Sequence, residues 1–271
     1  SEGLQKFASD RLRRILTAMT TNRVTGMLTG VLITALIQSS SATTVMVVSF
    51  VNAGLLTLGQ SIGVIMGANI GTTVTAWIIS ALGFKIDIAA FALPMLAFAI
   101  PLFFSSKSQR KSMGEFIFGF AFLFMGLQSL KVNAPDLGAN PDMLAFVQNY
   151  TDLGFFSIIL FLIIGAVLTM IVQASAATMA ITLIMCANGW IDYHLGVALV
   201  LGENIGTTIT ANLAALTGNT QARRAALAHL VFNVFGVMWV LLLFYPFTDC
   251  VSWFVEHVMG ITDPAVAVSF K

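Results

Sequence analysis

The chain has 271 residues, of which 58% are hydrophobic and only 9% charged, and its mean hydropathy is +0.91. Soluble globular proteins carry roughly 25% charged residues, so this composition argues against a water-soluble fold. The formal net charge of +1 leaves no basic footprint for nucleic acid, and the two cysteines match no metal or redox spacing. We therefore expect an all-α integral membrane protein without a nucleic acid partner.

Uncharged stretches locate the membrane segments. Asp, Glu, Lys and Arg are absent from residues 24–84 and 153–191. Because a spanning helix needs about 20 apolar residues, the apolar stretches predict ordinary spans at about 60–82, 88–104, 114–130, 194–217 and 225–247. The stretches at about 24–52 and 153–190 are each cut in the middle by a polar cluster. Polar backbone at membrane depth has to be buried in protein or line water, so we expect two re-entrant helical hairpins there.

Basic residues in the short loops indicate the orientation. Five of them precede the first hairpin, namely Lys6, Arg11, Arg13, Arg14 and Arg23. This predicts a multi-pass protein with a cytoplasmic N-terminus and with residues 132–152 as an extracellular linker. The chain starts at Ser1 without an initiator Met, so we also expect it to be a fragment of a longer protein.

The chain contains an internal repeat. Shifted by 135 positions, the 48 residues from Gly30 to Trp77 show 15 identities without a gap. We divide the chain accordingly into a first repeat at 1–131 and a second at 153–271. In the predicted topology the first copy starts inside and the second outside, so the repeats are inverted. Inverted repeats are typical of secondary transporters, which bind substrate near the midplane on broken helices.

The first duplicated motif places hydroxyls where a hairpin tip restarts a helix. It reads Gln38-Ser-Ser-Ser41 in the first copy and Gln173-Ala-Ser175 in the second. Ser and Thr are good N-caps, and a helix N-terminus attracts anions. Hydroxyls donate to anionic oxygens, while Gln can contact an anion or a cation. The alternative is that the hydroxyls bond back to their own helices, but the duplicated cluster favours an anion site.

The second duplicated motif is Gly-x-Asn-Ile-Gly-Thr-Thr, at Gly67–Thr73 and Gly202–Thr208. Two glycines around an Asn weaken a helix and can free carbonyls, and the oxygens of Asn and Thr suit Na⁺. The alternative is a Gly-xxx-Gly helix contact, and the two interpretations are compatible. Glu203 replaces Ala68 of the first copy. An acidic residue at membrane depth is costly, so it could neutralise a cation or carry a proton. The alternative is that it faces a water-filled vestibule.

His229 and Asn233 lie four residues apart on one predicted helix face. We expect a hydrogen-bonded structural histidine here rather than a substrate ligand. The chain contains no hydrolase or ATPase motif, so we expect no enzyme.

These motifs carry a family resemblance. Gln38-Ser-Ser-Ser41, Gln173-Ala-Ser175 and the two Asn-Ile-Gly-Thr-Thr motifs resemble the type II sodium/phosphate cotransporter family, in its bacterial branch. The resemblance implies sodium-driven import of inorganic phosphate by alternating access in a bacterial inner membrane. It implies no cofactor other than the co-transported sodium ion. This chain has Ala174 and Ala176 where a fuller second motif would have Ser.

The motifs and the resemblance together assign the two ligands. The predicted phosphate residues belong to the hairpin tips and are Ser39, Ser40, Ser41, Thr43, Gln173, Ser175 and Thr178. The predicted sodium residues are Gln38, Asn69, Thr72, Thr73, Gln173, Glu203, Asn204, Thr207 and Thr208. Sodium is the only metal expected.

Other partners and functions remain open at this stage. Besides the lipid bilayer, the resemblance suggests a PhoU-like domain or protein in the full-length context, and it leaves a homo-oligomer open. The first alternative function is sodium- or proton-coupled transport of another small oxyanion. The second is a non-transporting regulatory subunit of the membrane, which would not explain the duplicated polar motifs.

Overall fold

The computed structural model describes residues 19–83, 88–132, 150–151 and 153–261. Most of the linker predicted at 132–152, and the basic residues at 6, 11, 13 and 14, lie outside the described residues. Within the described ranges the regular elements are all helices. They are α2 (Arg23–Ile37), α3 (Ser40–Asn52), α4 (Leu58–Gly83), α5 (Ile88–Phe103), α6 (Ser108–Val132), α8 (Phe155–Val172), α9 (Ser175–Ala187), α10 (Tyr193–Gly206), α11 (Thr208–Ala215), α12 (Thr220–Leu242), α13 (Phe244–Trp253) and the π-helix η2 (Phe254–Val258).

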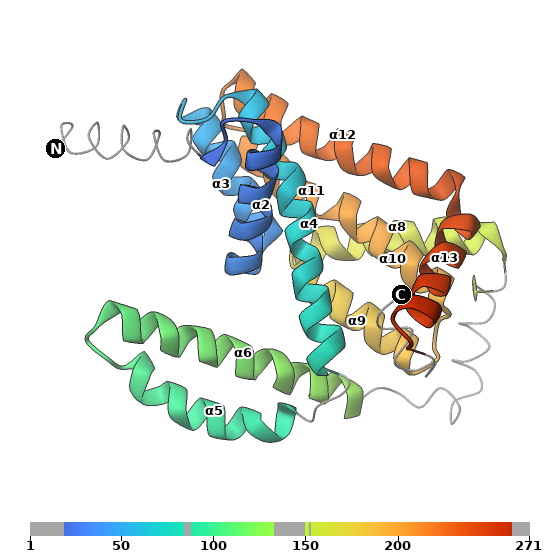
Figure 1. The fold of residues 1–271 in the computed structure, drawn as a ribbon, viewed down its shortest axis with the longest axis horizontal. Coiled ribbons are helices and arrows are strands. Elements are labelled where there is room, and N and C mark those ends of the chain that lie inside the picture. The colour runs from blue at the N-terminus through green and yellow to red at the C-terminus, as the bar shows by residue number, and fades with distance from the viewer. Residues whose placement is uncertain (1–18, 84–87, 133–149, 152, 262–271) are drawn as a thin grey trace.

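The helices of the two sequence repeats interlock. Helix α2 packs along α4 and helix α8 packs along α10, while α3 and α9 also lie against α4 and α10. Contacts then cross between the repeats, because α11 and α12 pack against α3, and α9 against α4. The pair α5 and α6 lies to one side of this assembly (Figure 1).

The two short helix pairs, α2 with α3 and α8 with α9, have the same backbone conformation after each of their helices. Helices α2 and α8 end in left-handed residues, Gln38 with φ 58° and Gln173 with φ 55°. Helices α3 and α9 are followed by Gly54 and Gly189, which are also left-handed, with φ of 71° and 69°. The nitrogen of Gln38 donates to the Thr34 carbonyl at 2.7 Å, and that of Gln173 to the Thr169 carbonyl at 2.8 Å. The sequence repeat is therefore also a repeat of local structure.

Glycines bring α2 onto α4 and α8 onto α10 without side chains between them. A Cβ atom on Gly67 would lie 1.9 Å from the Met27 carbonyl oxygen. In the second copy, a Cβ atom on Gly202 would lie 1.9 Å from the Leu162 carbonyl oxygen. The Gly-xxx-Gly interpretation of the second motif is thus confirmed as a helix contact, since no side chain fits at either position.

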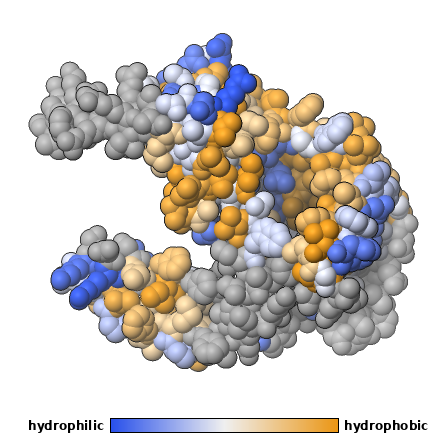
Figure 2. All heavy atoms as spheres, viewed as in Figure 1, coloured by the Kyte–Doolittle hydropathy of each residue, from blue (hydrophilic) through white to orange (hydrophobic). Residues whose placement is uncertain are grey.

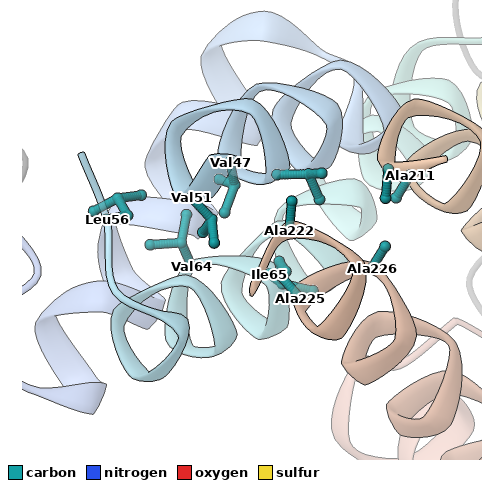
Figure 3. Packing of buried hydrophobic residues seen from close by; sticks show 11 residues of the cluster. Val47, Val51, Leu56, Val64, Ile65, Ala211, Ala222, Ala225 and Ala226 are labelled. Carbon is teal, nitrogen blue, oxygen red and sulfur yellow. The ribbon is translucent and has the colours of Figure 1, made fainter. Parts of the chain in front are cut away.

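The main cross-repeat core joins α3 and α4 to α11 and α12. Figure 3 shows valines and isoleucine from the first repeat facing alanines of the second. The alanines on α12 bury their whole side chains, which lets this helix approach closely. The cluster consists of Val47, Val48, Val51, Leu56, Val64, Ile65, Ala211, Ala215, Ala222, Ala225 and Ala226.

A polar clamp closes the same interface at the end of α3. The side-chain oxygen of Asn52 accepts from the Asn219 backbone nitrogen at 2.7 Å. The Asn219 amide donates in return to the Asn52 carbonyl at 3.0 Å. Asn219 also caps α12, because its side-chain oxygen accepts from the Ala222 nitrogen at 2.9 Å. One residue therefore starts α12 and fixes it to the first repeat.

Apolar side chains cover much of the outer surface (Figure 2). They form stripes at helical spacing along single helices, as with Leu227, Val231 and Phe235 on α12. By length and composition, α8 and α12 are long and apolar enough to cross a bilayer. Exposed apolar patches of this extent mark contact with lipid or protein rather than water. The surface agrees with the composition in describing a membrane protein.

The helix predicted to break in both copies breaks in one. Helix α4 runs unbroken through Gly67–Thr73, whereas α10 ends at Gly206 and α11 begins at Thr208. The interruption is slight, because Thr207 keeps helical dihedral angles and its nitrogen still donates to the Glu203 carbonyl at 2.9 Å. Gly67 and Gly71 pack against α2 as Gly202 and Gly206 pack against α8, so neither the glycines nor their packing decides whether the helix breaks.

The glycine contact predicts a position-specific response to alanine. Gly67→Ala should destabilise the protein by about 1–3 kcal/mol, because the new methyl group forces α2 and α4 apart. Gly59→Ala on the same helix meets no atom within 4 Å and should be neutral or stabilising by up to about 1 kcal/mol. Thermal unfolding of both variants in detergent measures the difference. Equal midpoints would contradict the packing role of Gly67.

Candidate functional site

The first tip is built by a left-handed glutamine followed by a capping serine. Gln38 ends α2, and its amide nitrogen donates to the Ala35 carbonyl. Ser39 is the N-cap of α3, and its hydroxyl oxygen accepts from the Ala42 nitrogen at 3.1 Å. Ser40 is buried, while Gln38, Ser39 and Ser41 are half-buried. The start of α3 therefore lies directly after the reversal of the chain, as expected for a tip that presents a helix N-terminus.

The second tip has the same backbone but a different cap. Gln173 ends α8 and its side chain is exposed. Ala174 occupies the N-cap position of α9 and has no side chain that could accept a hydrogen bond. The N–H group of Ala177, which is equivalent to Ala42 in the first copy, donates instead to the Ala174 carbonyl at 3.1 Å. Replacing Ser by Ala at this tip therefore removes a hydroxyl, while the backbone donor keeps a partner.

Hydrogen bonding divides the predicted hydroxyls into two groups. The threonines donate back to carbonyls of their own helices, as Thr43 does to Ser39 at 3.0 Å and Thr178 to Ala174 at 3.4 Å. In the described part of the chain, the hydroxyls of Ser40, Ser41 and Ser175 make no hydrogen bond. The alternative of back-bonding thus holds for the threonines, and these three serines are the hydroxyls available to an anion.

The predicted sodium threonines behave like Thr43. Their hydroxyl groups donate to backbone carbonyls three or four residues earlier, at distances of 2.7–3.2 Å. This holds for Thr72, Thr73, Thr207 and Thr208. A hydroxyl that donates to a carbonyl still carries lone pairs for a cation. Thr207 and Thr208 are buried, while Thr73 is exposed. The second copy therefore buries the two threonines of its motif more completely than the first.

Asn69 belongs to a hydrogen-bonded group that spans the two repeats. Its amide nitrogen donates to the Asn233 side-chain oxygen at 2.9 Å, and its oxygen lies 3.3 Å from His229 Nε2. Asn233 in turn donates to the His229 carbonyl at 2.9 Å. The expectation of a hydrogen-bonded histidine at His229 is confirmed. The equivalent Asn204 is exposed, and its side chain makes no hydrogen bond among the described residues.

Glu203 is buried on α10 without a partner for one oxygen. Its side chain is 3% exposed, and Oε2 makes no hydrogen bond. The ion pair between His194 and Asp192 does not involve it. Neutralising such a carboxylate requires a cation or a proton, because an uncompensated buried charge costs many kcal/mol.

Sequence reasoning missed a pair of buried threonines below the tips. Thr34 on α2 donates to Thr43 on α3 at 3.1 Å and so ties the first pair of helices together. Its counterpart Thr169 is also buried, but its hydroxyl has no partner. The signal was present in the sequence, because these two threonines are identical under the repeat shift. Side-chain packing then made the two copies differ.

The site offers little positive charge to an anion. Lys and Arg are absent from residues 24–84 and 153–200, which include both tips and the first-copy motif. Among the described residues, no group of three or more His, Cys, Asp or Glu side chains could hold a metal ion. The available donors are serine hydroxyls, amide groups and the N–H groups that begin α3 and α9.

Comparisons with known proteins place the chain in a family. The model of the Na⁺/Pi-cotransporter family matches residues 1–132 and 139–261. The chain is 32% identical over 273 residues to "Uncharacterized protein YqeW" of Bacillus subtilis, covering 99% of this chain and 82% of that protein. It is 29% identical over 250 residues to "Putative inorganic phosphate export protein YjbB" of Salmonella typhimurium, covering 91% of this chain and 44% of that protein.

A short segment extends the similarity to a mammal. Over 63 residues the chain is 49% identical to "Sodium-dependent phosphate transport protein 2A" of Ovis aries, covering 23% of this chain and 10% of that protein. No solved structure matches the chain. The matching family is one of transporters and not of enzymes. Because its model covers nearly the whole length, the chain belongs to the Na⁺/Pi-cotransporter family.

Proposed function

We propose that this protein is a sodium-coupled secondary transporter that imports inorganic phosphate by alternating access. Membership of the family and the printed names of its relatives support phosphate as substrate. The observation that carries the proposal is the pair of left-handed glutamines, Gln38 and Gln173, each placed immediately before a helix N-terminus.

A left-handed glutamine is costly for the backbone. Non-glycine residues in this region cost roughly 1–2 kcal/mol, and the same chain uses Gly54 and Gly189 where the helix pairs end in the same conformation. The amide side chain is therefore what distinguishes the tips from the other ends. Strained residues of this kind cluster at ligand sites, which supports binding roles for Gln38 and Gln173.

The phosphate site consists of the tip residues of both copies. Ser40, Ser41 and Ser175 donate their hydroxyl protons to phosphate oxygens, supported by the N-termini of α3 and α9. The remaining tip residues complete the set of phosphate ligands because they belong to the same two tips, and they are Ser39, Thr43, Thr178 and Gln173. Each helix terminus contributes only about 0.3–2 kcal/mol, which is too little to stabilise a buried divalent anion. Bound sodium supplies the missing positive charge.

The sodium sites lie next to the tips in the second motif of each copy. Asn69, Thr72 and Thr73 serve the first copy, together with Gln38. The second copy contributes Asn204, Thr207, Thr208 and Gln173, and the unpaired carboxylate of Glu203 adds a negative charge. Since each ion reduces the cost of burying the other, neither binds well alone. Coupling follows from this mutual dependence.

Helix lengths support a re-entrant hairpin in the first copy, whereas α8 of the second copy is long and apolar enough to cross a bilayer. Helices α2 and α3 have 15 and 13 residues, or about 22 and 20 Å at 1.5 Å per residue. The hydrocarbon core is about 30 Å thick, so neither helix crosses it alone. We place the two pairs as inverted hairpins in the inner membrane, with a cytoplasmic N-terminus. In this arrangement the tips meet near the midplane and the repeats alternate around them.

The left-handed glutamines give a test that separates function from folding. Gln173→Gly should keep or raise the thermal midpoint, because glycine relieves the backbone strain and the exposed side chain makes no hydrogen bond. The same variant should lose at least about tenfold in phosphate uptake, since one charge-assisted hydrogen bond contributes about 1.5–3 kcal/mol. Uptake into proteoliposomes and melting in detergent measure the two effects.

The reverse substitution is the matched control. Gly189→Gln places a glutamine in the same backbone conformation away from the tips, so it should lower the midpoint and leave uptake unchanged. A Gln173→Gly protein that transports at the wild-type rate would refute the role of this amide.

Sodium dependence is tested by equilibrium binding. Phosphate should bind the purified protein more tightly in Na⁺ than in choline at the same ionic strength, because Na⁺ compensates its charge. Linkage requires phosphate to raise sodium affinity by the same factor. Titrations of each ion, at fixed concentrations of the other, give both factors. Equal phosphate affinity in the two buffers would disprove the charge-compensation mechanism even if transport were found.

The direction of transport is a separate prediction. Phosphate uptake into proteoliposomes should rise with an inward Na⁺ gradient and reverse to efflux when the gradient is reversed, because coupling follows the gradient. Labelled phosphate on either side of the membrane measures both directions. Efflux that ignores the Na⁺ gradient would favour export, the activity in the name of the Salmonella relative.

A further inference from the structure

Three side chains from two repeats form one directed chain of hydrogen bonds around the second motif. Asn233 and His229 lie one turn apart on α12, and Asn69 lies inside the motif on α4. The bonds are Asn233 to the His229 carbonyl at 2.9 Å, Asn69 to Asn233 at 2.9 Å, and His229 to Asn69 at 3.3 Å.

The backbone carbonyl of His229 fixes the direction of this chain. A carbonyl only accepts, so the atom of Asn233 beside it must be the amide nitrogen. The oxygen of Asn233 then faces Asn69, whose facing atom must be its own nitrogen. The Asn69 oxygen is left facing His229, and Nε2 must carry the proton that it donates. The orientation of the Asn69 amide therefore follows from one carbonyl, without the usual ambiguity of amides.

The burial of His229 makes this arrangement unfavourable for the stability of the fold. The ring is 0% exposed, and Nδ1 is buried without a hydrogen bond partner. Leaving a buried polar atom unpaired costs free energy that an apolar side chain of similar size would not. The one hydrogen bond of the ring is to Asn69. The imidazole therefore serves at this position to hold the Asn69 amide.

The second copy lacks such a support. The same shift of 135 positions places Pro94 and Phe98 at His229 and Asn233, and they have neither an imidazole nor an amide. The asparagine that they would face is Asn204, which is exposed and without a side-chain hydrogen bond. The two Asn-Ile-Gly-Thr-Thr motifs therefore differ, with one asparagine held from the other repeat and one left unheld.

We propose that His229 and Asn233 are positioning residues that hold the Asn69 amide with its oxygen fixed for sodium. The oxygen accepts one bond from His229 and keeps a second lone pair for the ion. Because α12 belongs to the second repeat, the first-copy sodium site is complete only when the repeats are docked. This inference rests on the proposed sodium coupling, and it makes α12 a part of the first-copy sodium site.

Two isosteric replacements of His229 separate positioning from packing. The amide nitrogen of glutamine reaches about as far as Nε2, whereas that of asparagine reaches only as far as Nδ1. His229→Gln should therefore keep the sodium concentration for half-maximal phosphate uptake within about twofold of wild type. His229→Asn should raise it about tenfold, corresponding to roughly 1.4 kcal/mol, and Asn233→Leu should do the same. In each variant the maximal rate of phosphate uptake should change less than the sodium concentration for half-maximal uptake.

The matched control is another amide that bridges to α12. Asn52 on α3 accepts from the Asn219 backbone nitrogen at the start of α12 at 2.7 Å and belongs to neither proposed ion site. Asn52→Leu should lower the thermal midpoint and leave the sodium half-saturation unchanged. Titrations use the full-length protein in proteoliposomes with a potassium-balanced Na⁺ series.

The outcomes are distinguishable. The inference is overturned if His229→Asn and Asn233→Leu keep the wild-type sodium half-saturation while wild-type uptake depends on Na⁺. It is also overturned if His229→Gln is as impaired as His229→Asn, because the position of the donor is then irrelevant. Wild-type uptake that ignores Na⁺ would defeat the proposed function, and this inference with it.

Discussion

The structure depends on direct backbone contact between paired helices. Gly67 lies against the Met27 carbonyl and Gly202 against the Leu162 carbonyl, at separations where even a methyl group would overlap. This contact sets each short pair of helices on the helix that carries the second motif. Inside a membrane, where lipid is as apolar as leucine, close packing of small residues is the main source of helix association.

Charge compensation is the second constraint on the site. The polar segments contain no Lys or Arg, and the buried Glu203 has an oxygen without a partner. An anion and a carboxylate in one apolar environment have to be neutralised by something that the chain does not contain. In our proposal sodium meets this requirement, and each ion then depends on the other for binding. Helix N-termini orient the anion but contribute too little to hold it.

The two copies are alike in backbone and unlike in polar side chains. Thr34 is bonded to Thr43, whereas Thr169 has no partner, and Asn69 is held across the repeats, whereas Asn204 is exposed. A duplicated scaffold can thus carry two sites of different strength. In our proposal the first-copy site is preorganised by α12, while the second has a carboxylate. Substitutions at equivalent positions are therefore not expected to have equal effects.

The sequence by itself determined the membrane class, the helices and the duplicated motifs, because charge gaps, apolar length and identities at one shift depend only on local composition. It also singled out Gln38 and Gln173 and predicted that a helix restarts close after each of them, as α3 and α9 do. Only the tertiary structure decided that the glutamines are left-handed, that the threonines bond to their own helices, and that α4 stays unbroken. It also decided that Asn69 meets Asn233, a residue 164 positions away. Contacts between distant segments depend on how helices pack, and a pattern along one chain does not contain that information.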